Sequence, residues 1–268
     1  MRPIFPDSDS VVLFTGNYGS GKTEVSVNVA TALARYGGVK VTIADLDLVN
    51  PYFRSREARG PMEELGVKVV APAGDMHNAD LPILLPEVRG AVANPDGFTL
   101  LDVGGDNVGA TVLSSLVPTF NARGYAMHFV LNKNRPFTDT IDGAMRLMDE
   151  IEAASKLKVT HITGNTHLME DTTVEMAQEG AAFCAEAAER RGVNPGFVTC
   201  PATELVKAKL LDPEQAQQVK GLLDLDGFSG IPVLPLKRIM LPPWLGGPAP
   251  GSMATHARDR FSQLTGKG

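Results

Sequence analysis

The sequence has 268 residues, of which 43% are hydrophobic and 21% charged, values that are ordinary for a folded protein of one large or two small domains. The formal net charge of −6 provides no overall attraction to nucleic acid or anionic lipid, so both are disfavoured as partners. The first residues, "MRPIFPDSDS", lack a signal-peptide pattern, and no later stretch approaches the ~18 apolar residues of a membrane helix. We therefore expect a cytoplasmic protein.

The pattern of apolar segments predicts strands that alternate with helices. A strand is expected at 11–16, "VVLFTG", followed by a Gly-rich loop and a helix at 23–38. Seven further apolar runs are typical of strands, and most are separated by segments long enough to cross over a sheet. These runs cover residues 40–47, 67–72, 98–105, 127–133, 158–165, 196–201 and 231–237. The order predicts an α/β fold of the P-loop NTPase type, with a doubly wound, mostly parallel sheet and helices on both faces.

Two of the crossover segments carry a clear helical pattern. Ile141, Met145, Met148 and Ile151 form one apolar stripe, and the Ala-rich segment 172–192 stops at a glycine. Both helices are expected to cover the sheet, with the methionines as core residues rather than a partner groove.

Two further features are expected to serve packing. Cys184 shares a helical face with alanines, and Cys200 ends a strand, so burial is favoured over chemistry for both.

We expect residues 1–240 to form one nucleotide-binding domain and the Pro- and Gly-rich residues 241–268 an irregular C-terminal extension. Its Trp244 is interpreted as packing of that tail in preference to a partner anchor.

Residues 16–23, "GNYGSGKT", fit the phosphate-binding pattern G-x-x-x-x-G-K-[ST]. The loop leaves an apolar strand and opens a helix, where free backbone N–H groups favour a bound phosphate. Lys22 is expected to reach the β- and γ-phosphates, and the Thr23 hydroxyl to bind Mg²⁺. The loop residues expected to bind the nucleotide are Gly16, Asn17, Tyr18, Gly19, Ser20, Gly21, Lys22, Thr23 and Glu24.

Carboxylates at the ends of two predicted strands support this interpretation. Asp45 and Asp47 end one strand and point the same way in an extended chain, and Asp102 ends another. Asp102 and Gly105 fit a D-x-x-G pattern, in which the carboxylate faces the water shell of the metal and the glycine N–H can contact the γ-phosphate.

The segments "GNYGSGKT", "DLDLVNP" and "DVGGD", in this order, resemble the MinD/ParA-type P-loop ATPases, the CobQ/CobB/MinD/ParA nucleotide-binding domain, over residues 10–240. The resemblance implies ATP and Mg²⁺ as cofactors. It implies that Asp45 helps to hold the magnesium shell, that Asp47 acts in catalysis with the loop lysine by orienting the attacking water, and that Asp102 supports the metal. It also implies that Asn165 contacts the base.

The sequence departs from this family at one position. Members carry a second, signature lysine early in the loop, where this chain has Asn17 and Tyr18. In the family that lysine crosses a nucleotide-sandwich homodimer, so its loss predicts slow turnover or another cation. Arg54 and Arg56 are candidates for that cation, and two solvated arginines are an equally good interpretation.

Two weaker signals do not indicate further chemistry. "LNKNR" has Arg135 where a guanine-binding motif needs Asp, which favours adenine. His161 and His167 lack a recognised set of metal-ligand partners, which favours structural roles.

The function predicted from the sequence is magnesium-dependent ATP binding with slow hydrolysis, used as a conformational switch on an unidentified protein partner. Two alternatives stay open. One is a small-molecule kinase or ATP-dependent ligase of the dethiobiotin synthetase type, and the other is a non-hydrolysing nucleotide-binding adaptor.

Overall fold

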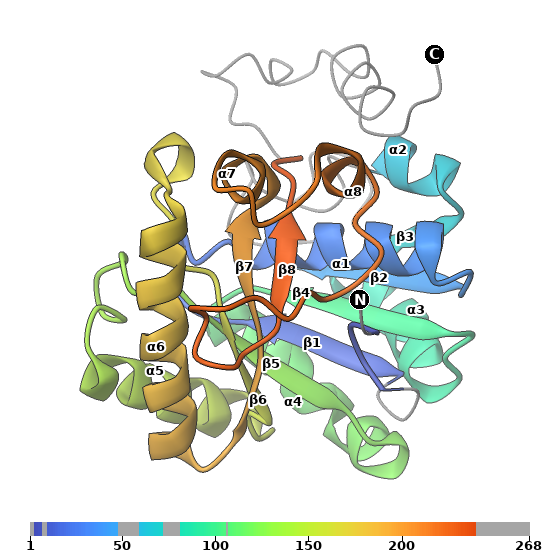
Figure 1. Cartoon of the computed structure of the whole chain (residues 1–268). Coiled ribbons are helices and arrows are strands. Elements are labelled where there is room, and N and C mark those ends of the chain that lie inside the picture. The colour runs from blue at the N-terminus through green and yellow to red at the C-terminus, as the bar shows by residue number, and fades with distance from the viewer. Residues whose placement is uncertain (1–2, 7–9, 48–58, 72–80, 106, 240–268) are drawn as a thin grey trace.

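The structure consists of one β-sheet with α-helices packed against it (Figure 1). The computed structural model describes residues 3–6, 10–47, 59–71, 81–105 and 107–239. Arg54, Arg56, Trp244 and the predicted extension 241–268 lie outside these residues. The strands are β1 (Val11–Thr15), β2 (Val41–Leu46), β3 (Val67–Val70), β4 (Phe98–Val103), β5 (Ala126–Leu131), β6 (His161–Gly164), β7 (Asn194–Pro201) and β8 (Val233–Leu236). The α-helices are α1 (Lys22–Tyr36), α2 (Arg59–Glu64), α3 (Leu81–Ala93), α4 (Asn107–Arg123), α5 (Ile141–Ser155), α6 (Val174–Arg191), α7 (Ala202–Lys207) and α8 (Pro213–Gln217).

The strands form an eight-stranded sheet in the order β3-β2-β4-β1-β5-β6-β7-β8. Each neighbouring pair in that order is parallel. The chain first winds outward from β1 to β3 and then returns through β4 and β5 on either side of β1. This order confirms the predicted fold class, an α/β P-loop NTPase fold with a doubly wound parallel sheet. The carboxyl ends beside β1 lie where the winding reverses, the usual ligand position in such sheets.

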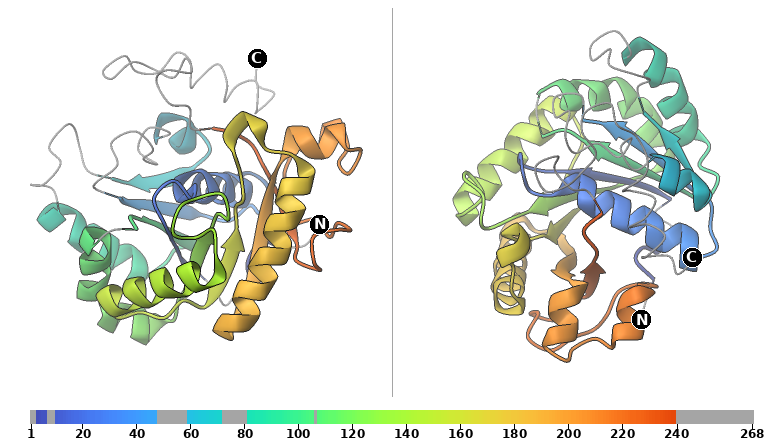
Figure 2. Two further views of the ribbon diagram at one scale, coloured as in Figure 1. Left: turned by 90° about the vertical axis from the view of Figure 1, so that its left-hand side faces the viewer. Right: turned by 90° about the horizontal axis from the view of Figure 1, so that it is seen from above.

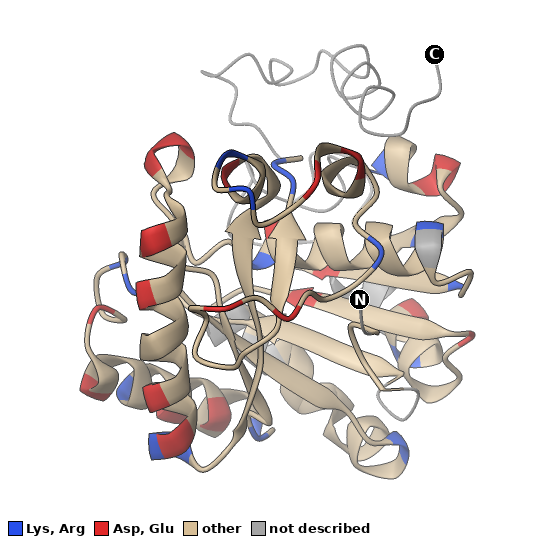
Figure 3. Cartoon of the chain, in the orientation of Figure 1, with Lys and Arg blue, Asp and Glu red and all other residues tan. Residues whose placement is uncertain are grey.

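Helices cover both faces of the sheet, as predicted (Figure 2). Alternation along β1 explains the two layers, because successive side chains of a strand point to opposite faces. Val11 and Leu13 pack in the core cluster that contains residues of α3, α4, α5 and α6. Val12 and Phe14 pack in the other cluster, against α1 and α2. Few charged residues lie on the strands, and most belong to helices and loops (Figure 3).

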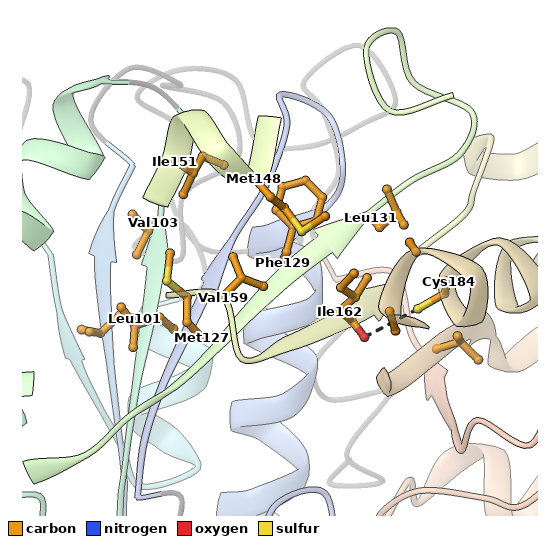
Figure 4. Close-up of a cluster of buried hydrophobic side chains, with 14 of the residues drawn as sticks. Leu101, Val103, Met127, Phe129, Leu131, Met148, Ile151, Val159, Ile162 and Cys184 are labelled. Atoms are coloured by element: carbon orange, nitrogen blue, oxygen red, sulfur yellow. Dashed lines mark hydrogen bonds between the residues drawn. The ribbon is translucent and has the colours of Figure 1, made fainter. Parts of the chain in front are cut away.

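The predicted packing roles of the helical stripe and of both cysteines are confirmed. Met148 and Ile151 of α5 are buried, and both lie in the cluster drawn in Figure 4. Cys184 of α6 is fully buried and its Sγ donates to the carbonyl of Ile162 at 3.6 Å. Cys200 is buried at the end of β7. Burial raises the pKa of both thiols to about 12, so neither is a reactive thiolate in the folded state.

The ends of the helices follow from local sequence. Thr173 caps the start of α6 by accepting from the N–H of Met176, and Gly192 ends it with a φ of 73°, which favours glycine. Among the described helices, none has both the length and the apolar content needed to span a lipid bilayer.

Candidate nucleotide-binding site

The phosphate loop lies between β1 and α1, as the motif predicts. Gly16, Gly19 and Gly21 have φ values of 148°, 71° and 85°, a backbone region that favours glycine. Gly21 is the N-cap of α1, and no side chain caps the helix there. The first N–H groups of α1 are therefore available to an anion, and the helix dipole favours negative charge at this end.

The two side chains that open α1 are held inside the loop. Lys22 is only 6% exposed, and its Nζ donates to the backbone carbonyl of Asn17 at 3.1 Å. Thr23 is equally buried, and its hydroxyl lies close enough to Asp102 to affect the pKa of that carboxyl. The loop thus presents one ammonium and one hydroxyl to a ligand, which are the groups that a magnesium nucleotide needs.

The three predicted acidic residues converge beside the loop. Asp45 and Asp102 occupy paired positions in the parallel register of β2 with β4. Both are buried, and the N–H of Asp47 donates to Oδ1 of Asp45 at 3.1 Å. Asp47 lines a cavity together with Lys22 and Thr23. The structure thus brings together the residues that the sequence assigned to magnesium and to catalysis.

Asp102 is the electrostatically unusual group of this site. Its pKa is raised to about 7, mainly by burial and also by the charge of the nearby Asp47, while the Thr23 hydroxyl and Lys22 oppose the rise. Among the residues that the structure describes, neither of its carboxylate oxygens has a hydrogen-bond partner. A buried carboxylate in that state suits a hydrated cation, whose water would donate to it.

The donor set fits magnesium bound mainly through water and phosphate. Within the described ranges, no group of three or more His, Cys, Asp or Glu side chains is arranged to hold a metal ion alone. Mg²⁺ commonly keeps several waters and takes one or two protein ligands plus substrate phosphates. Thr23, Asp45 and Asp102 would supply those few protein contacts.

Gly105 connects the D-x-x-G turn to the phosphate loop. A Cβ at this position would lie 2.1 Å from the carbonyl oxygen of Gly16, so a side chain cannot fit without moving the loop. The close approach places the backbone of Gly105 against the phosphate loop. Its predicted contact with a γ-phosphate stays a prediction.

Side chains from the loops after β5 and β6 hold the phosphate loop from outside. Nε of Arg135 donates to the carbonyl of Gly19 at 2.9 Å. Nδ2 of Asn165 donates to the carbonyl of Ser20 at 2.6 Å. In return, Nδ2 of Asn17 donates to the carbonyl of Pro136 at 2.6 Å. The phosphate loop is thus tied to both neighbouring loops before any ligand binds.

Asn165 also accepts a hydrogen bond from the Thr199 hydroxyl of β7, so its amide connects the phosphate loop to the next strand. Its predicted contact with a base stays a prediction, although the residue lines the cavity. Glu24, another predicted nucleotide residue, lines the same cavity and its carboxylate accepts from the N–H of Ile239. Tyr18 is 74% exposed at the tip of the phosphate loop.

The cavity beside the loop has a volume of about 990 Å³. It extends from the phosphate loop past Asn165 and His167 to α7, α8 and the segment after β8. Its size lies at the upper end of the range for small-molecule and cofactor sites.

The two histidines lie in different surroundings, and the structural roles expected for them stay a prediction. His161 stacks on His128 with ring centres 4.7 Å apart. His167 lies beside Gly21, and burial, Arg135 and Arg238 lower its pKa to about 4. Its position at the phosphate loop was not predicted.

Arg135 is the main site residue that the sequence interpretation missed. The sequence motif marks it only as the residue that replaces the guanine-binding Asp. The available signal is its place in the loop after β5, since β5 pairs with β1 and therefore ends beside the phosphate loop. That signal depends on the strand order, which one sequence does not specify.

Comparison of the sequence with known protein families and with curated proteins gives no match. Solved structures with a similar fold include the 54 kDa protein of the signal recognition particle from Aeropyrum pernix in complex with GDP, at 17% identity and a TM-score of 0.49, covering 72% of this chain and 42% of that one. FtsY from Thermotoga maritima is 18% identical with a TM-score of 0.48, covering 73% of this chain and 63% of that one. A nucleotide-binding protein from Archaeoglobus fulgidus in complex with ADP is 17% identical with a TM-score of 0.43, covering 72% and 82%. The chain spans 42%, 62% and 57% of the lengths of the first three similar structures.

Proposed function

We propose that this protein is a magnesium-dependent ATP-binding protein of the MinD/ParA type that hydrolyses ATP slowly and acts as a nucleotide-dependent switch on a protein partner. The observation that carries the proposal is the convergence of Lys22 and Thr23 with three buried carboxylates, Asp45, Asp47 and Asp102, at the carboxyl ends of adjacent strands. In this arrangement Lys22 neutralises the terminal phosphates. Magnesium, when bound, would neutralise the negative charge that develops on these phosphates during the reaction.

Asp47 is the candidate for orienting the attacking water. It lines the cavity beside Lys22, and its charge acts on Asp102. This position favours hydrolysis over the non-hydrolysing adaptor, which would need Asp47 to point away from the phosphates.

Adenine is proposed as the base because the position that would bind guanine is used differently. Arg135 stands where a guanine-binding motif has Asp, and its guanidinium bonds to Gly19. Asn132, which begins that segment, accepts from the backbone N–H groups of Asn134 and His167 through its Oδ1. These side chains are therefore engaged in holding loops.

A protein partner is supported by the location of exposed apolar side chains. Within the part of the chain that the structure describes, the exposed large hydrophobic residues lie on the phosphate loop and on the loops after β5 and β6. They are Tyr18, Phe137, Leu168 and Met169. Exposed apolar residues on the loops around a ligand site are candidates for contact with another protein. A second copy of this chain is one candidate, and specific activity that rises with protein concentration would support it.

A small-molecule kinase or ligase is retained as the second candidate because the cavity continues past the phosphate loop to α7 and α8. Such room could hold a co-substrate. ATP turnover that requires an added small molecule and yields a phosphorylated or ligated product would favour this candidate.

The first test of the proposal is the Lys22→Ala variant. We expect it to lose tight binding of Mg·ATP in calorimetry, because the charge aimed at the β- and γ-phosphates is removed. Lys133→Ala is the matched control, since Lys133 pairs instead with Glu179 at 3.3 Å on the surface. Unchanged ATP affinity in Lys22→Ala would contradict a functional phosphate loop.

A further inference from the structure

Arg135 is the cation whose side chain lies on the outside of the phosphate loop. Its Nε bonds to the carbonyl of Gly19, and its Nε and Cζ atoms lie 3.2 and 3.3 Å from where a Cβ on Gly19 would be. A side chain on Gly19 would therefore crowd the guanidinium, which lies close against this residue. The charge thus lies against the middle of the loop that wraps the phosphates.

The guanidinium has hydrogen-bonding capacity to spare. Arginine offers five N–H donors in a planar fork. Only the Nε donor of Arg135 has a partner in the described part of the chain, and no carboxylate there pairs with it. By contrast, Lys133 of the same segment pairs with Glu179. An arginine without a carboxylate partner, placed at an anion-binding loop, is suited to contact the anion itself.

The segment that carries Arg135 is held firmly. The Thr138 hydroxyl donates to the carbonyl of Asn132 at 2.8 Å, and the N–H of Arg135 donates to the same carbonyl at 3.2 Å. Asn17 of the phosphate loop donates to the carbonyl of Pro136, directly after Arg135. The loop and the segment are therefore connected in both directions, so the arginine is positioned in advance of ligand binding.

We infer that Arg135 is a second cation of the phosphate-binding site, acting within the same chain, whose Nη groups contact the terminal phosphates of a bound polyphosphate. The inference rests on the proposed function for its ligand class, a nucleoside triphosphate. It assigns to Arg135 a role in charge neutralisation that requires no second subunit. Asn17 acts as a positioning residue, because it holds the segment on which Arg135 lies.

Arg135→Gln separates this role from a purely structural one. The Gln Nε2 lies at the same place along the side chain as the Arg Nε, so it can keep the bond to Gly19 while the charge and both Nη groups are lost. Lys133→Gln is the matched control, because it removes one positive charge from the same segment. Thermal unfolding of both variants checks that the fold is retained.

The probes are inorganic pyrophosphate, tripolyphosphate, ADP and ATP, each with Mg²⁺, measured by calorimetry. We expect Arg135→Gln to weaken the binding of tripolyphosphate and ATP at least ~10-fold, and the binding of pyrophosphate and ADP about 3-fold or less. The reason is that a cation at the terminal phosphates acts most on the longer phosphate chain. Arg135→Lys is expected to restore part of the loss, and Lys133→Gln to leave all four affinities unchanged. Single-turnover hydrolysis of ATP should fall at least ~10-fold in Arg135→Gln.

Two results would overturn the inference. One is an Arg135→Gln variant that binds and hydrolyses like the parent, which would limit Arg135 to its bond with Gly19. The other is an equal loss for all four ligands, which would indicate a disturbed loop. A parent that binds tripolyphosphate through Arg135 but hydrolyses no nucleotide would leave the inference standing and overturn the proposed hydrolysis. Failure of the parent to bind any of the four ligands would overturn both.

Discussion

Asp45 and Asp102 face each other at paired positions of β2 and β4, both buried beside the phosphate loop. Ionising Asp102 in so dry a place is costly, and the charge of the nearby Asp47 adds to that cost, while the Thr23 hydroxyl and Lys22 oppose it. Without magnesium, the raised pKa of Asp102, about 7, indicates that this carboxyl is partly protonated near neutral pH. Binding of a cation is expected to displace that proton.

The first prediction concerns the pH dependence of stability without magnesium. The pKa of Asp102 is raised from 3.8 to about 7 on folding, so between these values the folded state holds a proton that the unfolded state has released. The contribution of Asp102 to stability is thus lost as pH rises from about 4 to 7. Asp102→Asn should remove this loss, which is on the order of 4 kcal/mol, since the pKa rises from 3.8 to about 7 and one pKa unit corresponds to about 1.4 kcal/mol.

Urea unfolding of the parent and of Asp102→Asn at pH 5 and pH 7.5, without Mg²⁺, measures this difference. The variant should gain stability relative to the parent at the higher pH. Identical pH dependence in the two proteins would show that Asp102 does not titrate in this range.

The second prediction concerns Asp47. Asp47→Ala should leave ATP affinity within about 3-fold of the parent and lower hydrolysis at least ~100-fold, since general-base or water-orienting groups typically contribute that much. Calorimetry and single-turnover phosphate release provide the two measurements. Retained hydrolysis in this variant would remove Asp47 from the reaction and strengthen the kinase or adaptor alternative.

The third prediction concerns the close approach of Gly105 to Gly16. Gly105→Ala would place a Cβ 2.1 Å from the Gly16 carbonyl and so displace the phosphate loop. We expect lower thermal stability, by about 1–3 kcal/mol as for other overpacked sites, and an ATP affinity reduced at least ~10-fold. The matched control is Gly90→Ala, because a Cβ on Gly90 in α3 meets nothing within 4 Å. Equal behaviour of the two variants would argue against a rigid contact at Gly105.

The fourth prediction concerns the buried His128. Its ring packs against Phe5, Phe14 and Phe197, and burial followed by the neighbouring His161 lowers its pKa well below 6.5. Since the unfolded chain takes up a proton that the folded chain refuses, stability is lost as pH falls below about 6.5.

His128→Phe should make that acid loss smaller, by up to about 1.4 kcal/mol per pH unit relative to the parent. Chemical unfolding at pH 5 and pH 8 tests it, with the pH 8 value as the reference for packing changes. A variant whose stability falls between these pH values as steeply as that of the parent would contradict the prediction.

The sheet could be predicted from the sequence because its strands are buried on both faces. Each predicted apolar run corresponds to an observed strand, although the ends differ; the run at 158–165, for example, narrows to His161–Gly164. The helices α3 and α4 were expected only as crossover segments. Each contains an internal proline, Pro86 or Pro118, which weakens the local helical signal even though the surrounding chain packs as a helix.

Site residues could be predicted from the sequence where their position depends only on the end of a strand. They could not be predicted where their position depends on the order of the strands in the sheet. Asp45 and Asp102 could be assigned because the carboxyl ends of parallel strands share one edge of the sheet. Arg135 and His167 could not, because their positions require that β5 and then β6 lie beyond β1 on the side away from β4.

The central position of β1 has a consequence for biosynthesis. Val11 pairs with Thr99 of β4, and Val12 with Ala126 of β5, so during synthesis β1 acquires these neighbours only after much later segments have left the ribosome. Until then the nascent chain carries an apolar strand with two open edges, a state prone to association with other chains. Competence to hold a ligand is therefore acquired only after β4 and β5 have been made, although the phosphate loop precedes both in the chain.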